Sequence, residues 1–184
     1  MIDVRRLSLE GVVEIVPKKF GDGRGFFSET YSQAALAKEG INVSFVQDNH
    51  SLSAKPGVLR GLHYQIPPFA QAKLVRVTRG RIFDVTVDIR PLSPNFSNWA
   101  GVEISADKWN QIFVPEGFAH GFVTLEPDTE VVYKVSAAYS PEHERTIRFD
   151  DPDIAIQWPM ENSEMILSDK DRNARSLKHF ATGF

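Results

Sequence analysis

Along this chain runs a series of short segments of strand length, each bounded by turn residues. In residues 82–89, apolar side chains alternate with Asp84, Thr86 and Asp88. A repeat of two is the period at which a β-strand places its side chains on opposite faces of a sheet. We therefore predict a strand here, in a sheet that has one face in water.

Similar segments recur along most of the chain. Gly80 lies between two of them, so we expect a hairpin turn at residues 79–81. Many short strands at close spacing are typical of a β-sandwich or a barrel. The chain shows no repeat and no linker, and we predict one all-β domain over residues 1–184. The other strand-like segments are residues 74–77, 102–104, 111–114, 122–125 and 130–135.

Helix is scarce in this sequence. Ser32 is a good N-cap for residues 32–39, and Gly40 follows as a helix stop. Near the C-terminus, Ser168 stands three residues before Asp171, a pattern that caps a second short helix. We expect only a few short helices beside the strands.

Composition excludes several classes of protein. The formal net charge is −3, which gives no electrostatic reason to expect binding to nucleic acid. No run reaches the ~18 apolar residues of a transmembrane helix, and the N-terminus lacks the apolar core of a signal peptide. There are no cysteines, which excludes disulfides and thiolate metal sites. We expect a cytoplasmic protein that binds neither nucleic acid nor membrane.

The most informative chemical motif is Arg-Gly-Leu-His-Tyr-Gln at residues 60–65. His63 is suited to carry a proton near neutral pH, and Arg60 can bind phosphate through paired hydrogen bonds. A base beside a phosphate anchor suggests acid–base chemistry on a phosphorylated or nucleotide-linked substrate. A regular strand would send these two side chains to opposite faces, and a bulge at Gly61 would bring them together. The pattern alone leaves this choice open.

Two further side chains are predicted to point inward. Tyr133 shares its parity with Val131 and Val135, so it faces the apolar side of its strand, where a phenol either packs or donates a proton. Lys73 shares its parity with Val75. An inward Lys needs a partner or a function, and the alternative is that its side chain reaches outward from a strand end.

The remaining histidines are less distinctive. His120 lies between two glycines, which indicates close backbone approach or an unusual turn, and the alternative is a packed side chain where a loop enters a strand. We assign His50 to turn chemistry. His143 and His179 lie in charged segments, and we expect both to be solvated.

A metal site is the main alternative to acid–base chemistry. Metal-binding β-barrels often carry two histidines one residue apart on a strand, with a carboxylate a few residues on. Here the partner position of His63 is Gln65, and residues 66–70 contain no acid. A His–Gln pair is a poor set of metal ligands. We expect neither a catalytic metal nor another cofactor.

Several segments together carry a resemblance to a known family. They are residues 22–29, 45–51, 57–65, 71–75, 83–90, 112–122, 133–134, 139–141 and 167–171. In these segments the chain resembles the cupin-fold nucleotide-sugar epimerases, and among them those that act in dTDP-L-rhamnose synthesis. The match is ordered and nearly end to end. It implies a cupin-type double-stranded β-helix, or jelly-roll barrel, and a dTDP-sugar substrate that reacts without a cofactor.

The resemblance also implies roles for individual residues. His63 would be the base, with Asp171 as its partner. Asp169 is an alternative partner, and Asp171 also fits as a simple helix cap. Tyr133 would be the acid on the opposite face of the sugar, and Lys73 would steady the enolate oxygen.

Other residues would bind the substrate. The resemblance puts Arg60 and His120 near the enolate oxygen and stacks Tyr139 on the thymine ring. The contacts with the nucleotide and its phosphates would come from Arg24, Glu29, Gln47, Asn49, Glu144 and Lys170. The thirteen Phe residues and the exposed-looking N-terminal strands further predict a homodimer.

The implied chemistry suits these groups. A ketone at C4 acidifies the hydrogens at C3 and C5, so a base can remove one and an acid can return a proton to the other face. Three alternatives stay open beside a 3,5-epimerase. They are an epimerase that acts at C3 or C5 alone, a metal-dependent cupin isomerase or dioxygenase, and a sugar-nucleotide binder without activity.

Overall fold

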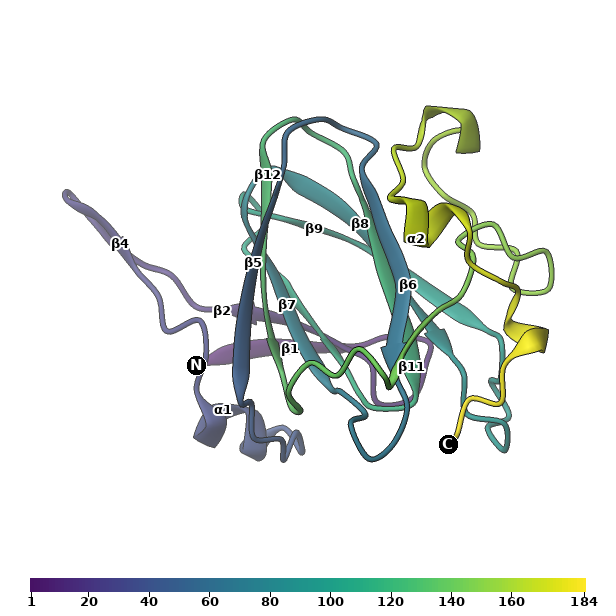
Figure 1. Ribbon diagram of the computed structural model, residues 1–184. Coiled ribbons are helices and arrows are strands. Elements are labelled where there is room, and N and C mark those ends of the chain that lie inside the picture. Colours follow the sequence, from purple (N-terminus) through teal and green to yellow (C-terminus); the bar gives the residue numbers. More distant parts are fainter.

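Two antiparallel sheets that face each other build the barrel in Figure 1, in a computed structural model that describes residues 1–184. The first sheet contains, in spatial order, β1 (Ile2–Arg6), β2 (Val13–Pro17), β10 (Gln111–Val114), β7 (Lys73–Arg79), β12 (Thr129–Val135) and β5 (Gln47–Ser53). The second contains β13 (Glu144–Thr146), β6 (Leu59–Gln65), β11 (Phe118–Thr124), β8 (Arg81–Asp88) and β9 (Trp99–Ser105). From β5 to β8, and again from β9 to β13, successive strands alternate between the sheets. The predicted all-β jelly-roll barrel is thus confirmed.

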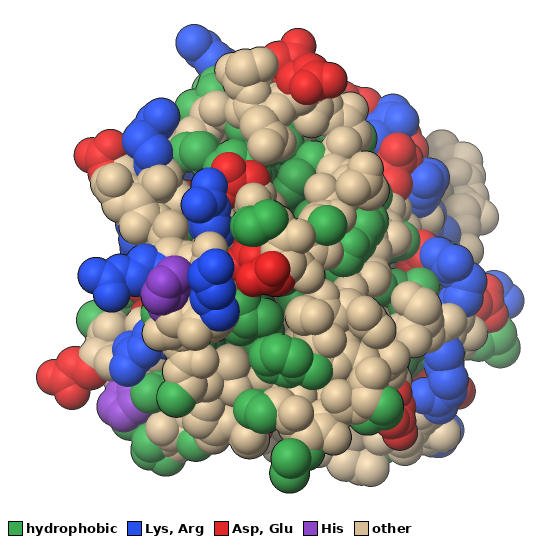
Figure 2. Space-filling model, turned by 90° about the vertical axis from the view of Figure 1, so that its right-hand side faces the viewer, with side chains coloured by type: hydrophobic (Ala, Val, Ile, Leu, Met, Phe, Trp, Pro, Cys, Tyr) green, Lys and Arg blue, Asp and Glu red, His purple; other side chains and the backbone are tan.

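Buried apolar side chains form several clusters, two of which lie on the two faces of the second sheet and a third on the outer face of the first sheet. Between the sheets lies a cluster that includes Val75, Ile82, Ile112 and Phe122, all buried. A second cluster lies on the outer face of the second sheet, where residues 147–184 cover it. The C-terminal segment, yellow in Figure 1, runs along this side. On the surface that it forms, hydrophobic side chains emerge only in separate small patches (Figure 2).

The polar face of β8 is not in water, so the predicted wet face is wrong. Asp84, Thr86 and Asp88 are fully buried and share the inward parity of Ile82. Their apolar neighbours face outward but are covered by the C-terminal segment. Both faces of this strand are therefore buried, and the polar side chains line the interior of the barrel.

The predicted hairpin at residues 79–81 is also wrong. β7 pairs with β10 and β12, whereas β8 pairs with β9 and β11, so the chain crosses between sheets at Gly80. Gly80 has φ of +78°, and a Cβ there would lie 2.4 Å from Oγ1 of Thr129. Only glycine fits this tight crossing. The hairpin partner of β8 is β9.

The short helices agree with their predicted caps. Ser32 caps α1 (Gln33–Lys38), and Ser168 caps α2 (Asp169–Arg172) by accepting a bond from the backbone N–H of Asp171. Two 3₁₀ turns, η1 (Asn162–Glu164) and η2 (Leu177–His179), complete the C-terminal segment. No helix in the chain is long and apolar enough to cross a membrane.

A small hairpin stands apart from the barrel. Its strands β3 (Phe20–Asp22) and β4 (Gly25–Phe27) pair only with each other, and they project from one side of the molecule (Figure 1). Phe20, Phe26 and Phe27 on this hairpin are exposed. An apolar surface on a projecting element is typical of a contact with another protein chain.

Candidate active site

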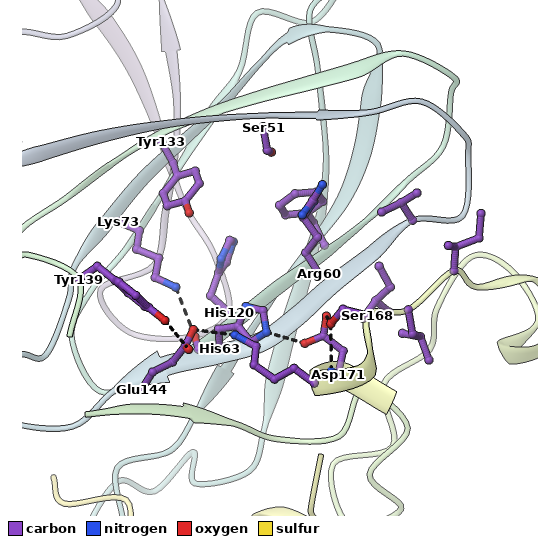
Figure 3. Close-up of a pocket in the computed structure, with 16 residues that line it drawn as sticks. Ser51, Arg60, His63, Lys73, His120, Tyr133, Tyr139, Glu144, Ser168 and Asp171 are labelled. Atoms are coloured by element: carbon purple, nitrogen blue, oxygen red, sulfur yellow. Dashed lines mark hydrogen bonds and ion pairs between the residues drawn. The ribbon is translucent and has the colours of Figure 1, made fainter. Parts of the chain in front are cut away.

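A cavity of about 520 Å³ opens between the two sheets, with α2 in its wall (Figure 3). A smaller space of about 230 Å³ adjoins it and shares several of its lining residues. Most of the predicted site residues meet here. The cavity and the adjoining space are lined by Arg60, His63, Lys73, His120, Tyr133, Tyr139, Glu144, Lys170 and Asp171, with Gln47 and Asn49 in the smaller part.

An irregularity in β6 brings Arg60 and His63 to the same side. The register between β6 and β11 shifts between the pair His120–His63 and the pair Phe122–Arg60. Gly61 and Gly121 approach each other at this point, and a Cβ on Gly61 would lie 2.5 Å from the Cα of Gly121. The bulge considered at Gly61 is therefore present, and both side chains line the cavity.

His63 and Asp171 form a buried pair. Nε2 of His63 lies 2.6 Å from Oδ1 of Asp171, and Ser168 donates to the other carboxylate oxygen at 2.8 Å. Burial lowers the pKa of His63 below its ordinary value, and Asp171 opposes part of that shift. Burial alone would raise the pKa of Asp171, but the bond with His63 keeps it below the usual value. His63 is thus neutral near pH 7 and beside a fixed carboxylate, as a base requires.

The two acids of α2 offer a matched test of this pairing. Asp171 is buried against His63, whereas Asp169 is exposed at the start of the same short helix. Asp171→Asn should slow proton abstraction roughly 10²-fold or more, because the imidazole loses its orienting charge. Asp169→Asn should leave it unchanged. Hydrogen–deuterium exchange on the substrate measures both, and the reverse order would make Asp169 the partner.

Lys73 is inward, as its parity predicts. It is buried at the end of β7, and its Nζ donates to the backbone carbonyl of His63 at 3.3 Å. Burial lowers the pKa of Lys73 to about 8, while Asp84 and Glu144 act in the opposite direction. At neutral pH the side chain is a buried ammonium at the cavity wall, able to stabilise negative charge that develops nearby.

Tyr133 also faces the cavity, as predicted. It lies on β12 in the first sheet, whereas His63 lies on β6 in the second, so the two project into the cavity from different sheets (Figure 3). Its hydroxyl makes no hydrogen bond with the protein, and burial raises its pKa. The phenol is therefore protonated at neutral pH and free to donate.

Three further polar residues close one side of the cavity. Tyr139 donates to Glu144 at 3.0 Å, and Nζ of Lys170 lies 2.8 Å from the other oxygen of Glu144. Burial opposes the charge of Glu144, but Lys170 holds its pKa below the usual value. Next to them, Gln47 accepts a bond from the backbone N–H of Tyr139 at 3.1 Å. The ring of Tyr139 is half exposed, so a planar group can stack on it.

The structure differs from the sequence predictions for two other histidines. His50 lies on β5, not in a turn, and its ring pairs with Glu130 at 3.0 Å. His143 is half-buried, not solvated, because it packs on Phe69 and bonds to Ser140. His179 is exposed, as predicted. None of the three lines the cavity.

Arg24 and Glu29 do not reach the cavity of their own chain. Arg24 is at the turn of the projecting hairpin, its side chain 91% exposed and paired with Asp22 at 2.6 Å. Glu29 is exposed between that hairpin and α1. Their predicted contacts with a nucleotide therefore need either movement of the hairpin or a second chain.

The sequence analysis also missed a fully buried residue that contacts the cavity lining from behind. Asp84, on the face of β8 that was predicted to be wet, lies 2.8 Å from Nε2 of His120. The sequence did contain a signal for Asp84. The alternation along β8 is unbroken, and acids on the inward face of such a strand form part of a polar barrel interior. No group of three or more His, Asp or Glu side chains is placed to hold a metal ion.

Comparisons with known proteins identify the family. Residues 6–179 match the family model of dTDP-4-dehydrorhamnose 3,5-epimerase. A protein of that name from Sinorhizobium fredii is 49% identical over 178 residues, which cover 97% of this chain and 91% of the relative. The crystal structure of the Bacillus anthracis epimerase with TDP and pyrophosphate bound has a TM-score of 0.92 and 46% identity, covering 96% of this chain and 99% of that one. The dTDP-6-deoxy-D-glucose-3,5-epimerase of Legionella pneumophila, in complex with dTDP-4-keto-L-rhamnose, has a TM-score of 0.92 and 43% identity, covering 97% and 94%. The chain belongs to the dTDP-4-dehydrorhamnose 3,5-epimerase family.

Proposed function

We propose that this protein inverts C3 and C5 of dTDP-4-dehydro-6-deoxy-D-glucose and so produces dTDP-4-dehydro-L-rhamnose for dTDP-rhamnose biosynthesis. The observation that carries the proposal is the arrangement in one cavity of a neutral His63 beside Asp171, a Lys73 ammonium and the free phenol of Tyr133. Family membership supplies the identity of the substrate. We also propose that the enzyme acts in the cytoplasm.

His63 starts the reaction as the base. It takes a proton from C3 or C5, and the bonding electrons move onto the C4 oxygen to give an enolate. The Lys73 ammonium stabilises that oxygen, which is worth typically ~3–4 kcal/mol for one preorganised donor. Tyr133 then gives its proton to the same carbon from the opposite face, which inverts it. Solvent returns a proton to the phenolate and removes one from the imidazolium before the second carbon reacts.

The remaining cavity residues bind the nucleotide in this proposal. Arg60 and Lys170 supply positive charge for the pyrophosphate, and Tyr139 supplies an exposed ring for the thymine. Gln47 and Asn49, bonded to each other at 2.8 Å, offer amide groups in the adjoining space. No metal takes part, so the reaction should proceed in the presence of a chelator.

A homodimer explains the position of the projecting hairpin. Its exposed Phe side chains need a partner surface, and its turn carries Arg24, a phosphate-binding type of residue remote from its own cavity. We infer that the hairpin contacts a second copy and brings Arg24 and Glu29 to that copy's cavity. Sedimentation should give twice the chain mass of 20.7 kDa. A monomer that is fully active would contradict this arrangement.

Tyr133→Phe should separate proton removal from inversion. His63 still removes a proton and returns one to the same face, so deuterium uptake at C3 or C5 survives while configuration is largely retained. Loss of one hydroxyl that bonds to nothing in the protein should change stability by roughly 1 kcal/mol or less. Isotope uptake and product stereochemistry are measured on one sample. Inversion at the wild-type rate would exclude Tyr133 as the acid.

The dependence of kcat/KM on pH should be bell-shaped. The acid limb should lie below the ordinary His value of ~6.5, because burial lowers the pKa of His63 and the base acts only when it is neutral. The basic limb should lie near 8, where Lys73 loses its charge. The phenol does not titrate in this range, since burial raises the pKa of Tyr133. A flat profile between pH 7 and 10 would remove Lys73 from the reaction.

Product analysis tests the proposed function. Purified protein is incubated with dTDP-4-dehydro-6-deoxy-D-glucose and a chelator, and the configuration of the product is read from proton NMR coupling constants. Inversion at both C3 and C5 is expected. Inversion at one carbon alone would make the protein a single-site epimerase, and activity only after a divalent ion is added would favour a metal-dependent mechanism.

A further inference from the structure

Asp84 is an unusual residue for the interior of a barrel. Its side chain is completely buried on β8, and one carboxylate oxygen accepts a bond from Nε2 of His120 at 2.8 Å. The other oxygen has no hydrogen-bond partner in the protein. A buried carboxylate with one unpaired oxygen costs free energy, so it is a poor choice for stability alone.

His120 connects Asp84 to the reacting centre. It lines the cavity and pairs across the sheet with His63 on one side and with Thr86 on the other. Because Asp84 bonds to Nε2, the ring is held in one orientation. Nδ1 makes no hydrogen bond with the protein and remains for a ligand in the cavity.

Asp84 also lies near Lys73, because Nζ of Lys73 bonds to the carbonyl of His63, whose cross-strand neighbour His120 bonds to Asp84. Among the charged groups around Lys73, Asp84 on β8 and Glu144 on β13 favour the ammonium, while Lys170 on α2 opposes it. Glu144 is already bonded to Lys170, so these two largely balance each other. That leaves Asp84 as the carboxylate not matched by another cation.

We propose that Asp84 is a positioning residue of this site, which fixes the His120 ring at the cavity wall and supplies the negative charge that balances the buried Lys73 ammonium. Without that charge, an ammonium in the barrel would tend to lose its proton and with it the ability to stabilise an enolate. The inference rests on the proposed function for its catalytic consequence. The charge balance itself is a property of the free protein.

Asp84→Asn tests the charge directly. The amide still accepts a bond from His120, so the substitution removes the charge and little else. The readout is the titration of Lys73 in the substrate-free protein, followed by NMR of isotope-labelled lysine side chains, with the Lys73 signal identified by its loss in Lys73→Met. The midpoint should fall by about one pH unit from its wild-type value near 8. The basic limb of kcat/KM should move by the same amount.

Asp88→Asn is the matched control. Asp88 is equally buried on the same face of β8, but its carboxylate bonds to Arg90 and Ser93. Its replacement should leave the Lys73 midpoint at the wild-type value, whatever it does to stability. An unmoved midpoint in Asp84→Asn, or an equal shift in Asp88→Asn, would overturn the charge-balancing role.

His120→Asn tests the positioning role, since it keeps the charge of Asp84 and removes the ring. The Lys73 midpoint should stay near that of the wild type, while kcat/KM should fall roughly 10-fold or more. Wild-type kcat/KM would overturn this part.

If Asp84→Asn does not fold, Asp84→Ala repeats the titration, and failure of both to fold would make Asp84 a structural residue instead. A wild-type protein without epimerase activity would count against the proposed function and leave the titration result standing.

Discussion

Replacing His63 with Ala should stop the exchange of the substrate's C3 and C5 hydrogens with solvent. The expected decrease in the exchange rate is roughly 10²–10⁴-fold, the usual contribution of a positioned general base. In the cavity, His63 combines a neutral form at pH 7 with a bond to the carboxylate of Asp171, as a general base requires. Deuterium uptake in heavy water, followed by NMR, measures the effect.

A histidine outside the cavity provides the control for this substitution. His179→Ala, in the exposed η2 turn, should exchange at the wild-type rate. Because His63→Ala leaves Asp171 buried with only Ser168 as a side-chain partner, the fold of the variant is first checked by circular dichroism. Undiminished exchange in a folded His63→Ala protein would remove His63 from the role of base.

Lys73→Met should lower kcat by roughly 10²–10³-fold, the cost of losing one preorganised donor to an oxyanion. The thermal stability should stay the same or increase, because Met fills a similar volume without the cost of burying a charge. Activity and Tm would then change in opposite directions, as expected for a residue kept for function.

The two measurements separate this account from a structural one. A large fall in Tm together with the fall in kcat would mean that Lys73 mainly holds the barrel together. Full activity in Lys73→Met would mean that another group stabilises the enolate. Lys178→Met, at an exposed position, is the control and should change neither quantity.

The strands that the sequence predicted well are short segments rich in β-branched and aromatic residues. Residues 130–135 lie within β12 (Thr129–Val135), and residues 111–114 coincide with β10 (Gln111–Val114). β5 was missed because its inward positions, Gln47, Asn49 and Ser51, line the cavity spaces rather than a core, so no apolar repeat marks the strand. The pattern of β8 was misinterpreted for the same reason: a polar barrel interior and a solvent-facing surface have the same alternation.

The site was predicted unevenly. The alternation of side chains along a strand correctly predicted that Tyr133 and Lys73 point inward, because each shares a face of its strand with buried valines. Parity failed between Arg60 and His63, where the Gly61 irregularity resets it. The pairing of His63 with Asp171 depends on a contact across 108 residues, which no local pattern contains. Arg24 belongs to a projecting hairpin, and its role depends on an assembly that a single chain does not define.

In the proposed mechanism, C3 and C5 are each inverted by removal of one proton and delivery of another from the opposite face. The most direct test is the reaction of the wild-type protein with dTDP-4-dehydro-6-deoxy-D-glucose in heavy water, with the isotope content of the product determined by NMR and mass spectrometry. The expected product is inverted at both carbons and carries one deuterium at each. An inverted product that retains the original hydrogen at either carbon would contradict this mechanism.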